Sequence, residues 1–537
     1  MDFNKNNMGC TKSKRCLLMK KNIILFCLFF ITTSLFSQNY KINKVNFEID
    51  GKTKEQNILK NAPIDYDTIF HSEQELLKYI EKYKIQLSNL RIYDDINIDK
   101  TITDTIINEF NEEINLLELS INLTESFSFL AVPYFKYDSN SGAVFKVKAK
   151  DTNFLGTLNT MNFDLNFQIE RNEETSTKNF ILGANFSYDH PFNICNLKAT
   201  FINDYSIDYT FGSGKLPEWD ALIGLKLVVP IKSLDLNIQF KQYSIRDVTY
   251  LPYNDEIYFE EILNFSLPIT ILKTENFSNL VYTPNTNFTY YWDFDGIHNK
   301  NTSLFSPIVS LGHSLSLGQV NWEGNFRKGL SLSLSNSFTY NFIKKEVVPY
   351  LNFQLTSHWN FVDSDNWFLQ RLGINAKFYS FVYIPLKNQK YYYGEQYGGF
   401  LRGIRDEQYF CSDITEFAGT KALSSFTAFT LCIDFPIKLF TTNFTKSFFK
   451  YFNFELQIAP FMDISLGYNR YTKRYFHPAD GFYTAGMEIL VYPQKWSSFT
   501  VRGSLGIDMG RFLNIVDKTW RANASLYEFS FGIGLHY

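Results

Sequence analysis

The chain has 537 residues, enough for more than one domain, and its formal net charge of −3 argues against a nucleic-acid-binding surface. Aromatic residues make up 18% of the sequence, with 34 Tyr and 54 Phe, yet the mean hydropathy is slightly polar. Apolar residues interleaved with polar ones suit lipid-facing strands better than transmembrane helices.

The first apolar run, residues 23–36, has the features of a secretory signal. Two lysines precede it, and Ser37 and Gln38 follow it. A basic segment, an apolar segment and a small residue at the exit predict cleavage near residue 38, which would remove residues 1–37. Met19 is a plausible true start. A membrane anchor is the alternative, but the run is too short to favour it.

Residues 38–126 predict one small α+β domain. The pattern indicates, in order, a strand, a short helix, a longer helix and two strands, at residues 40–51, 55–62, 72–90, 96–110 and 114–124. The longer helix is the clearest, because its apolar residues step by four and three along one face.

Residues 127–537 predict a transmembrane antiparallel β-barrel, so the whole chain is expected to be mostly β. Apolar and polar residues alternate through segment after segment, for example at 234–241 and 330–340. In 145–150 every second residue is lysine, which would be costly against lipid, so the polar face is predicted to line a watery lumen. Sixteen strands would allow roughly 25 residues each. Counting the alternating segments gives a number nearer eighteen, and both counts are even.

The C-terminal residues 527–537 alternate strictly with a period of two. Phe529, Phe531 and Tyr537 fall on one face, and Gly532 and Gly534 on the other. An unpaired apolar strand at the end of a chain invites aggregation, and closure of a barrel would remove that edge. Glycine weakens pairing within a strand, so the junction of the first and last barrel strands is predicted to be a weak seam.

No pattern of catalytic or metal-binding residues stands out. The seven histidines are scattered. His313 and Ser314 are adjacent, and adjacent residues of a strand point to opposite faces, which argues against a nucleophile–base pair. The cysteines predicted to remain after cleavage are far apart, without metal-ligand spacing. We therefore expect no enzymatic activity, no metal and no cofactor.

Three stretches of the predicted barrel resemble the BamA/TamA and two-partner-secretion transporter superfamily, whose members carry periplasmic POTRA domains. The stretches are Ala131–Thr157, the four residues Leu401, Arg402, Gly403 and Ile404, and the three residues Phe461, Met462 and Asp463. The resemblance implies that residues 38–126 form a POTRA domain. It also implies that Arg402 lies on a long loop folded back into the lumen, that Asp463 on the wall receives it, and that the last strand is a recognition signal.

The chain departs from the family pattern at two motif positions. Ile404 replaces the usual aromatic residue, and Ser465 stands where the family has glycine. The ion pair is also expected from the residues alone. Asp463 shares its face with Glu455 and the other polar residues of its strand, provided that Pro460 introduces no bulge. An Arg402–Asp463 pair on that face would hold the loop against the wall. The alternative is that Arg402 is an ordinary loop cation.

The resemblance implies an outer membrane protein of a Gram-negative-type bacterium that assists insertion or translocation of proteins, with its POTRA-like domain in the periplasm. Its expected partners are the lipid bilayer and unfolded outer membrane or secreted proteins. Accessory lipoproteins would also be consistent with the family. A passive porin or surface antigen that kept the fold without assembly activity remains the alternative, favoured by the altered motif positions and the single POTRA-like unit.

Overall fold

The computed structural model describes residues 38–107, 112–138, 142–171, 178–212, 216–246, 257–273, 279–294, 302–386, 390, 393–397, 401–403, 424–446, 449–469, 472–516 and 526–533. The chain divides into two compact units. The first contains residues up to Asp50, Ile58–Leu87 and Asp95–Thr124, and the second contains Gly51–Asn57, Ser88–Asp94 and Glu125–Tyr537. Two short segments of the predicted N-terminal domain therefore group with the second unit.

The first unit is built around a four-stranded sheet with the order β2-β1-β4-β3. β1 pairs in parallel with β4 and antiparallel with β2. The elements are β1 (Asn39–Asp50), α2 (Glu55–Asn61), β2 (Ile69–Phe70), α3 (Glu73–Asn89), β3 (Tyr93–Ile107) and β4 (Glu113–Glu125). The two helices and the three longer strands occur where the sequence predicts them. The assignment of this unit as a POTRA domain stays a prediction.

The core of the first unit follows from the two periodicities of its elements. α3 buries Leu76, Tyr83 and Leu87, which lie on one helical face. β4 buries alternate residues, including Leu119 and Ile121.

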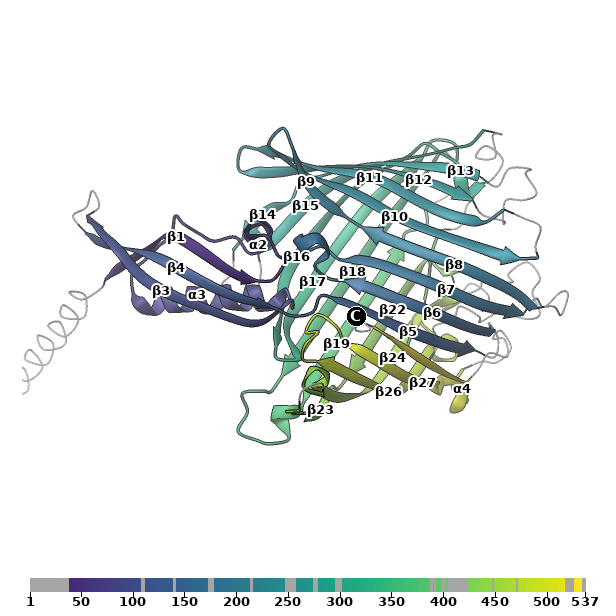
Figure 1. The fold of residues 1–537 in the computed structure, drawn as a ribbon. Coiled ribbons are helices and arrows are strands. Elements are labelled where there is room, and N and C mark those ends of the chain that lie inside the picture. Colours follow the sequence, from purple (N-terminus) through teal and green to yellow (C-terminus); the bar gives the residue numbers. More distant parts are fainter. Residues whose placement is uncertain are drawn as a thin grey trace, which may run out of the picture. The chain divides into compact units, whose positions relative to one another are not determined.

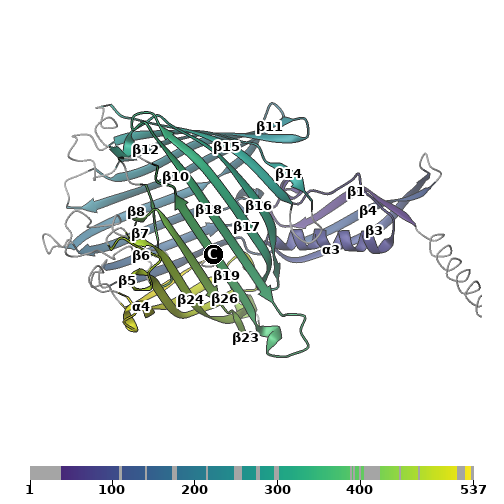
Figure 2. The same cartoon turned by 180° about the vertical axis from the view of Figure 1, so that it is seen from behind.

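The second unit contains a closed barrel of 22 strands, which Figures 1 and 2 show from opposite sides. Its neighbouring strands pair antiparallel. Its first half consists of β5 (Phe129–Asp138), β6 (Gly142–Asp151), β7 (Met161–Arg171), β8 (Lys178–Tyr188), β9 (His190–Ile194), β10 (Leu197–Phe211), β11 (Glu218–Ile231), β12 (Leu234–Arg246), β13 (Ile257–Ser266), β14 (Ile269–Leu272) and β15 (Leu280–Trp292). Its second half consists of β16 (Ile308–Glu323), β17 (Phe326–Asn341), β18 (Glu346–Asn360), β19 (Gly373–Tyr383), β22 (Thr427–Asp434), β23 (Ile437–Thr441), β24 (Phe454–Asn469), β25 (Arg474–Tyr475), β26 (Phe482–Pro493), β27 (Val501–Asp508) and β28 (Tyr527–Ile533).

Short helices accompany the barrel, and a separate two-stranded sheet is formed by β20 (Glu395–Gln396) and β21 (Ser424–Ser425). The helices are η1 (Phe154–Gly156), η4 (Thr302–Leu304), η5 (Leu369–Arg371), η8 (Phe449–Phe452), η9 (Pro478–Asp480) and α4 (Met509–Phe512). Among the described helices, none combines the length and apolar character needed to cross a membrane.

The barrel has more strands than the sixteen expected from chain length. β8 and β9 both pair with β10, β13 and β14 with β15, and β22 and β23 with β24, so each of these pairs is one interrupted strand. Counting each pair once, and leaving out the two-residue β25, reduces the 22 strands of the described residues to eighteen. The expectation of sixteen assumed long connections, whereas β11 and β12 are joined by a turn of only Lys232 and Ser233.

The inward side chains of the barrel are buried to different extents on different strands. On β11 and β12 the inward side chains of Lys226 and Lys241 are only partly buried, as expected beside a watery lumen. On β24 the inward side chains from Glu455 to Asn469 are buried at every second position. The sequence predicted a wet face here as well. The difference arises because residues 401–403 and the turn between β16 and β17 cover this stretch of wall.

The last strand closes the barrel. β28 lies between β27 and β5 in the strand order. Tyr527 and Phe529 are exposed at 66% and 54%, whereas Ser530 between Phe529 and Phe531 is buried. The predicted alternation is therefore present from Tyr527 to Ser530.

Candidate functional site

The candidate site is centred on Arg402, in the described segment 401–403. The chain reaches this segment from β20, which pairs with β21. Leu401, Arg402 and Gly403 are all buried against barrel residues. Ile404, the fourth residue of the predicted motif, lies outside the described residues.

The ion pair predicted between Arg402 and Asp463 is present. Nε of Arg402 donates to Oδ2 of Asp463 at 2.9 Å, and the terminal Nη2 donates to Oδ1 at 2.5 Å. The backbone N–H of Arg402 also donates to Oδ2, at 3.2 Å. Both side chains are 0% exposed. A bidentate pair with an added backbone bond fixes the guanidinium and the backbone of the segment together.

Two more carboxylates face the same guanidinium. Nη1 of Arg402 lies 3.3 Å from Asp434 on β22 and 3.6 Å from Glu488 on β26. Glu488 is in turn 3.4 Å from Nη1 of Arg502 on β27. Arg402 therefore contacts three barrel strands directly and a fourth, β27, through Glu488. Removing one member of a buried ion pair typically costs about 3–5 kcal/mol, because the remaining charge is left uncompensated.

Apolar contacts complete the site. The ring centroid of Phe461 lies 4.0 Å from Cζ of Arg402, a cation–π arrangement. Leu401 belongs to a buried cluster with Tyr397, Phe482, Cys432, Phe381 and Ala428. The barrel residues of this cluster face inward, so the segment shields this part of the wall from water.

The strand β24 positions Asp463 by simple alternation. Its register with β26 is continuous from Phe454 to Ser465, so Pro460 introduces no bulge. Asp463 therefore shares the inner face with Glu455 and Gln457, as predicted. Ser465, at the position where the resembled family has glycine, is buried and its hydroxyl lies 2.8 Å from that of Thr430.

The incoming part of the loop is held by two glutamates that sequence reasoning missed. Glu395 accepts hydrogen bonds from the hydroxyls of Tyr379 and Tyr383, at 2.9 and 3.2 Å. Glu346 accepts from the backbone N–H of Lys390 at 2.6 Å and from the hydroxyl of Tyr393 at 3.1 Å. The aromatic alternation of β19 was visible in the sequence, but nothing there indicated which acid it meets.

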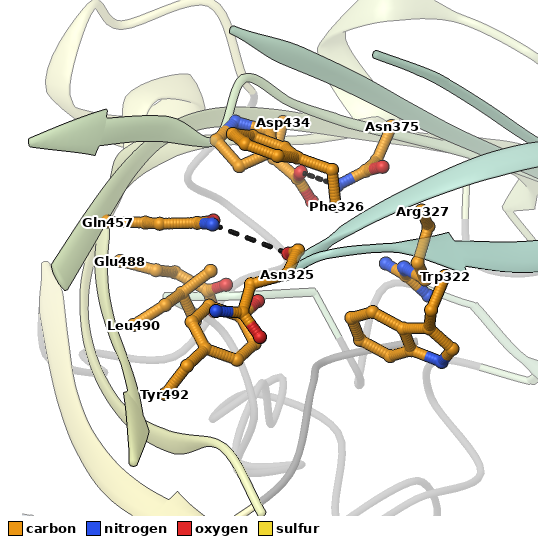
Figure 3. Close-up of a pocket in the computed structure, with 11 residues that line it drawn as sticks. Trp322, Asn325, Phe326, Arg327, Asn375, Asp434, Gln457, Glu488, Leu490 and Tyr492 are labelled. Carbon is orange, nitrogen blue, oxygen red and sulfur yellow. Dashed lines mark hydrogen bonds between the residues drawn. The ribbon is translucent and has the colours of Figure 1, made fainter. Parts of the chain in front are cut away.

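A small pocket, partly open to solvent, adjoins the Arg402 site and shares Asp434 and Glu488 with it. Figure 3 shows Trp322 and Arg327 on one side and Gln457 and Tyr492 on the other. Nε2 of Gln457 donates to the carbonyl of Asn325 at 3.3 Å. The turn between β16 and β17 therefore lies against β24, which explains part of the burial of that inner face.

The first resembled stretch, Ala131–Thr157, contains most of β5, all of β6, which pairs with β5, and the turn after β6. Asn153 organises this turn: its Oδ1 accepts from the N–H of Leu158 at 2.9 Å, and its Nδ2 donates to Thr53 at 2.7 Å. Of the predicted C-terminal signal, Phe529, Phe531 and Gly532 lie in β28, while Gly534 and Tyr537 fall outside the described residues. The described residues contain no cluster of potential metal ligands.

Comparisons with known proteins find similarity only in structure. No family model and no curated protein matches the sequence. CdiB from Escherichia coli is similar over 92% of this chain and 76% of its own, with 9% identity and a TM-score of 0.46. CdiB from Acinetobacter baumannii is similar over 92% and 73%, with 11% identity and a TM-score of 0.41. BamA from Haemophilus ducreyi lacking POTRA domains 1–3 is similar over 92% and 85%, with 12% identity and a TM-score of 0.37.

Proposed function

We propose that this protein is an outer membrane β-barrel that assists the insertion or translocation of proteins. In this proposal the first unit faces the periplasm and receives unfolded outer membrane or secreted proteins. Partner chains could add to its sheet edge by strand pairing. The barrel would act on the captured chain without catalytic chemistry, metal or cofactor. An accessory lipoprotein is compatible with this role.

The outer face of the barrel supports the location in a membrane. Large apolar side chains are exposed at alternate positions of strand after strand, such as Phe163, Leu165 and Phe167 on β7 and Met487 and Ile489 on β26. Soluble monomers rarely expose contiguous apolar surface of this extent. A closed barrel with an apolar exterior can lie in lipid, because its backbone groups pair between strands.

The observation that carries the functional proposal is the burial of Arg402 against Asp463. Desolvating a guanidinium is costly, and here a loop residue is enclosed by three carboxylates from three strands. The contact anchors the loop segment to the wall beside the closing strands, a position suited to a barrel that inserts or translocates proteins. The resemblance of both motifs to the assembly superfamily agrees with this role.

The alternative, a passive porin or surface antigen, is favoured by Ser465. Its hydroxyl pairs with that of Thr430 at a position where the resembled family has glycine, so the wall beside Asp463 differs chemically from the family pattern. Depletion of the protein in growing cells distinguishes the two functions. The proposal predicts lower levels of folded outer membrane proteins or of a secreted protein. The alternative predicts unchanged levels of both.

Replacement of Arg402 tests the proposal at the site. Arg402→Ala is expected to abolish complementation of the depleted strain, while the barrel remains in the membrane and keeps its heat-dependent mobility on a denaturing gel. Arg371→Ala is the matched control, because Arg371, the last residue of η5, donates to the carbonyl of Leu439 and lies over Trp367. Full complementation by Arg402→Ala would remove the ion pair as support for the function.

A further inference from the structure

The backbone of the loop segment comes unusually close to the barrel wall at two glycines. Gly403 has a φ of +91°, a conformation that side chains disfavour. It lies against Gly506 on β27. A Cβ added to Gly506 would be 2.6 Å from both Cα and N of Gly403 and 2.9 Å from the carbonyl carbon of Arg402. All three nearest atoms belong to the backbone of the loop segment.

A second glycine lies directly beside the first. Gly486 on β26 is the register partner of Gly506, and Phe461 on β24 is the partner of Gly486 on its other side. A Cβ on Gly486 would be 2.1 Å from the carbonyl oxygen of Leu505 on β27, 2.6 Å from Cζ of Phe461 and 2.9 Å from Cα of Gly506. The ring of Phe461 therefore extends over the space that the missing side chain leaves, and Arg402 lies over that ring.

We propose that Gly506, together with Gly486, positions the loop segment, and that the absence of side chains at this glycine pair allows Arg402 to reach Asp463. A Cβ on Gly506 would have to move from 2.6 to at least 3.4 Å from the backbone of Gly403 to make ordinary contact, a displacement of about 0.8 Å. The same displacement applied to the 2.9 Å bond between Arg402 and Asp463 would lengthen it beyond hydrogen-bonding distance.

This inference deepens the proposed function and rests on it for its biological meaning, but docking of the segment can be measured without any transport assay. Cys432 offers the measurement. It lies on the inner face of β22, is 5% exposed, and belongs to the cluster that contains Leu401. Displacement of the segment would uncover its thiol. The rate of maleimide labelling of Cys432, resolved from other cysteines by peptide mass spectrometry, therefore reports docking.

The decisive comparison is between Gly506→Ala and Gly503→Ala in the full-length protein. Both positions are on β27, but a Cβ on Gly503 would have only Phe531 nearby, at 3.9 Å. Gly506→Ala is expected to accelerate labelling of Cys432 by about tenfold or more through local opening of the segment. Gly503→Ala is expected to label at the rate of the unchanged protein. Heat-dependent gel mobility should be the same for all three, which shows an intact barrel.

Two outcomes would overturn the inference. Either Cys432 is labelled in both Gly506→Ala and Gly503→Ala at the rate of the unchanged protein, or its labelling is accelerated equally in both variants. A variant that combines Gly506→Ala with Arg402→Ala is expected to label no faster than Arg402→Ala alone, because both changes undock the same segment. Additive acceleration would also contradict the proposal. If Gly506→Ala no longer shows heat-dependent gel mobility, Gly403→Ala replaces it in the comparison. A Cβ on Gly403 would be 2.9 Å from the carbonyl carbon of Gly506, so this substitution creates the same close approach from the loop side. If Gly506→Ala is labelled rapidly but still complements the depleted strain fully, the role of Gly506 in docking the segment stands, and only the proposed function is contradicted.

Discussion

Arg402 makes contacts that a lysine could not reproduce. Its planar guanidinium donates to both oxygens of Asp463 while its face covers the ring of Phe461. An ammonium group is a compact point charge and cannot satisfy both requirements together. The identity of the residue, and not only its charge, therefore matters at this position.

Glu395 allows a test of the loop at a second residue. Glu395→Gln removes the negative charge that receives the hydroxyls of Tyr379 and Tyr383. Charged acceptors form stronger hydrogen bonds than neutral ones, so the change should weaken the local structure by about 1 kcal/mol. Faster hydrogen exchange of the amides of β20 would report this loss.

The control for Glu395 is Glu323→Gln, which alters a carboxylate paired with Lys328 in an exposed position. Exposed ion pairs contribute little, so exchange in β20 should not change. Unchanged exchange in both variants would mean that Glu395 does not hold the loop.

Individual elements follow their local patterns closely, and α3 shows this within two neighbouring residues. Leu76 is 0% exposed and faces the core of the first unit, whereas Leu77 is 49% exposed. Leu76→Ala should destabilise this unit by about 2–5 kcal/mol, the usual cost of deleting a buried leucine side chain. Leu77→Ala should change stability by no more than about 0.5 kcal/mol.

Hydrogen exchange of the α3 amides in the full-length protein measures both variants. A large loss of protection only in Leu76→Ala is the expected result. Similar losses in the two variants would contradict the assignment of the buried face.

The molecule as a whole is organised by the difference between the two faces of its barrel. On β17, Leu334 is 39% exposed and shares its parity with Phe338, which is 52% exposed. Ser333 lies on the opposite face. If the barrel spans a membrane, Leu334→Arg near the middle of this strand should cost about 2–4 kcal/mol, and Ser333→Arg should be tolerated in the lumen.

Urea unfolding of the protein in lipid vesicles, followed by gel mobility, measures this difference. Equal destabilisation by the two arginines would show that the face carrying Leu334 is not in contact with lipid. This outcome would remove the membrane location and, with it, the proposed transport role.

The sequence alone determined the features that depend on neighbouring residues. Period-two alternation predicted the β-barrel, apolar spacing predicted α3, and parity along β24 placed Asp463 on the inner face. The order of the two motifs predicted the Arg402–Asp463 pair. Each of these inferences uses periodicity within one segment, or a resemblance, and does not require knowledge of how distant segments meet.

Only the tertiary structure decided which distant residues share the site. Asp434 and Glu488 reach Arg402 because β22 and β26 flank β24, and Gly506 meets Gly403 because residues 401–403 lie against β27. The burial of the β24 face likewise depends on a turn between β16 and β17 that lies far away in the sequence. These contacts are set by the strand order, the register and the closure of the barrel. The local sequence around a contact residue does not specify any of these, because each depends on how distant segments pair.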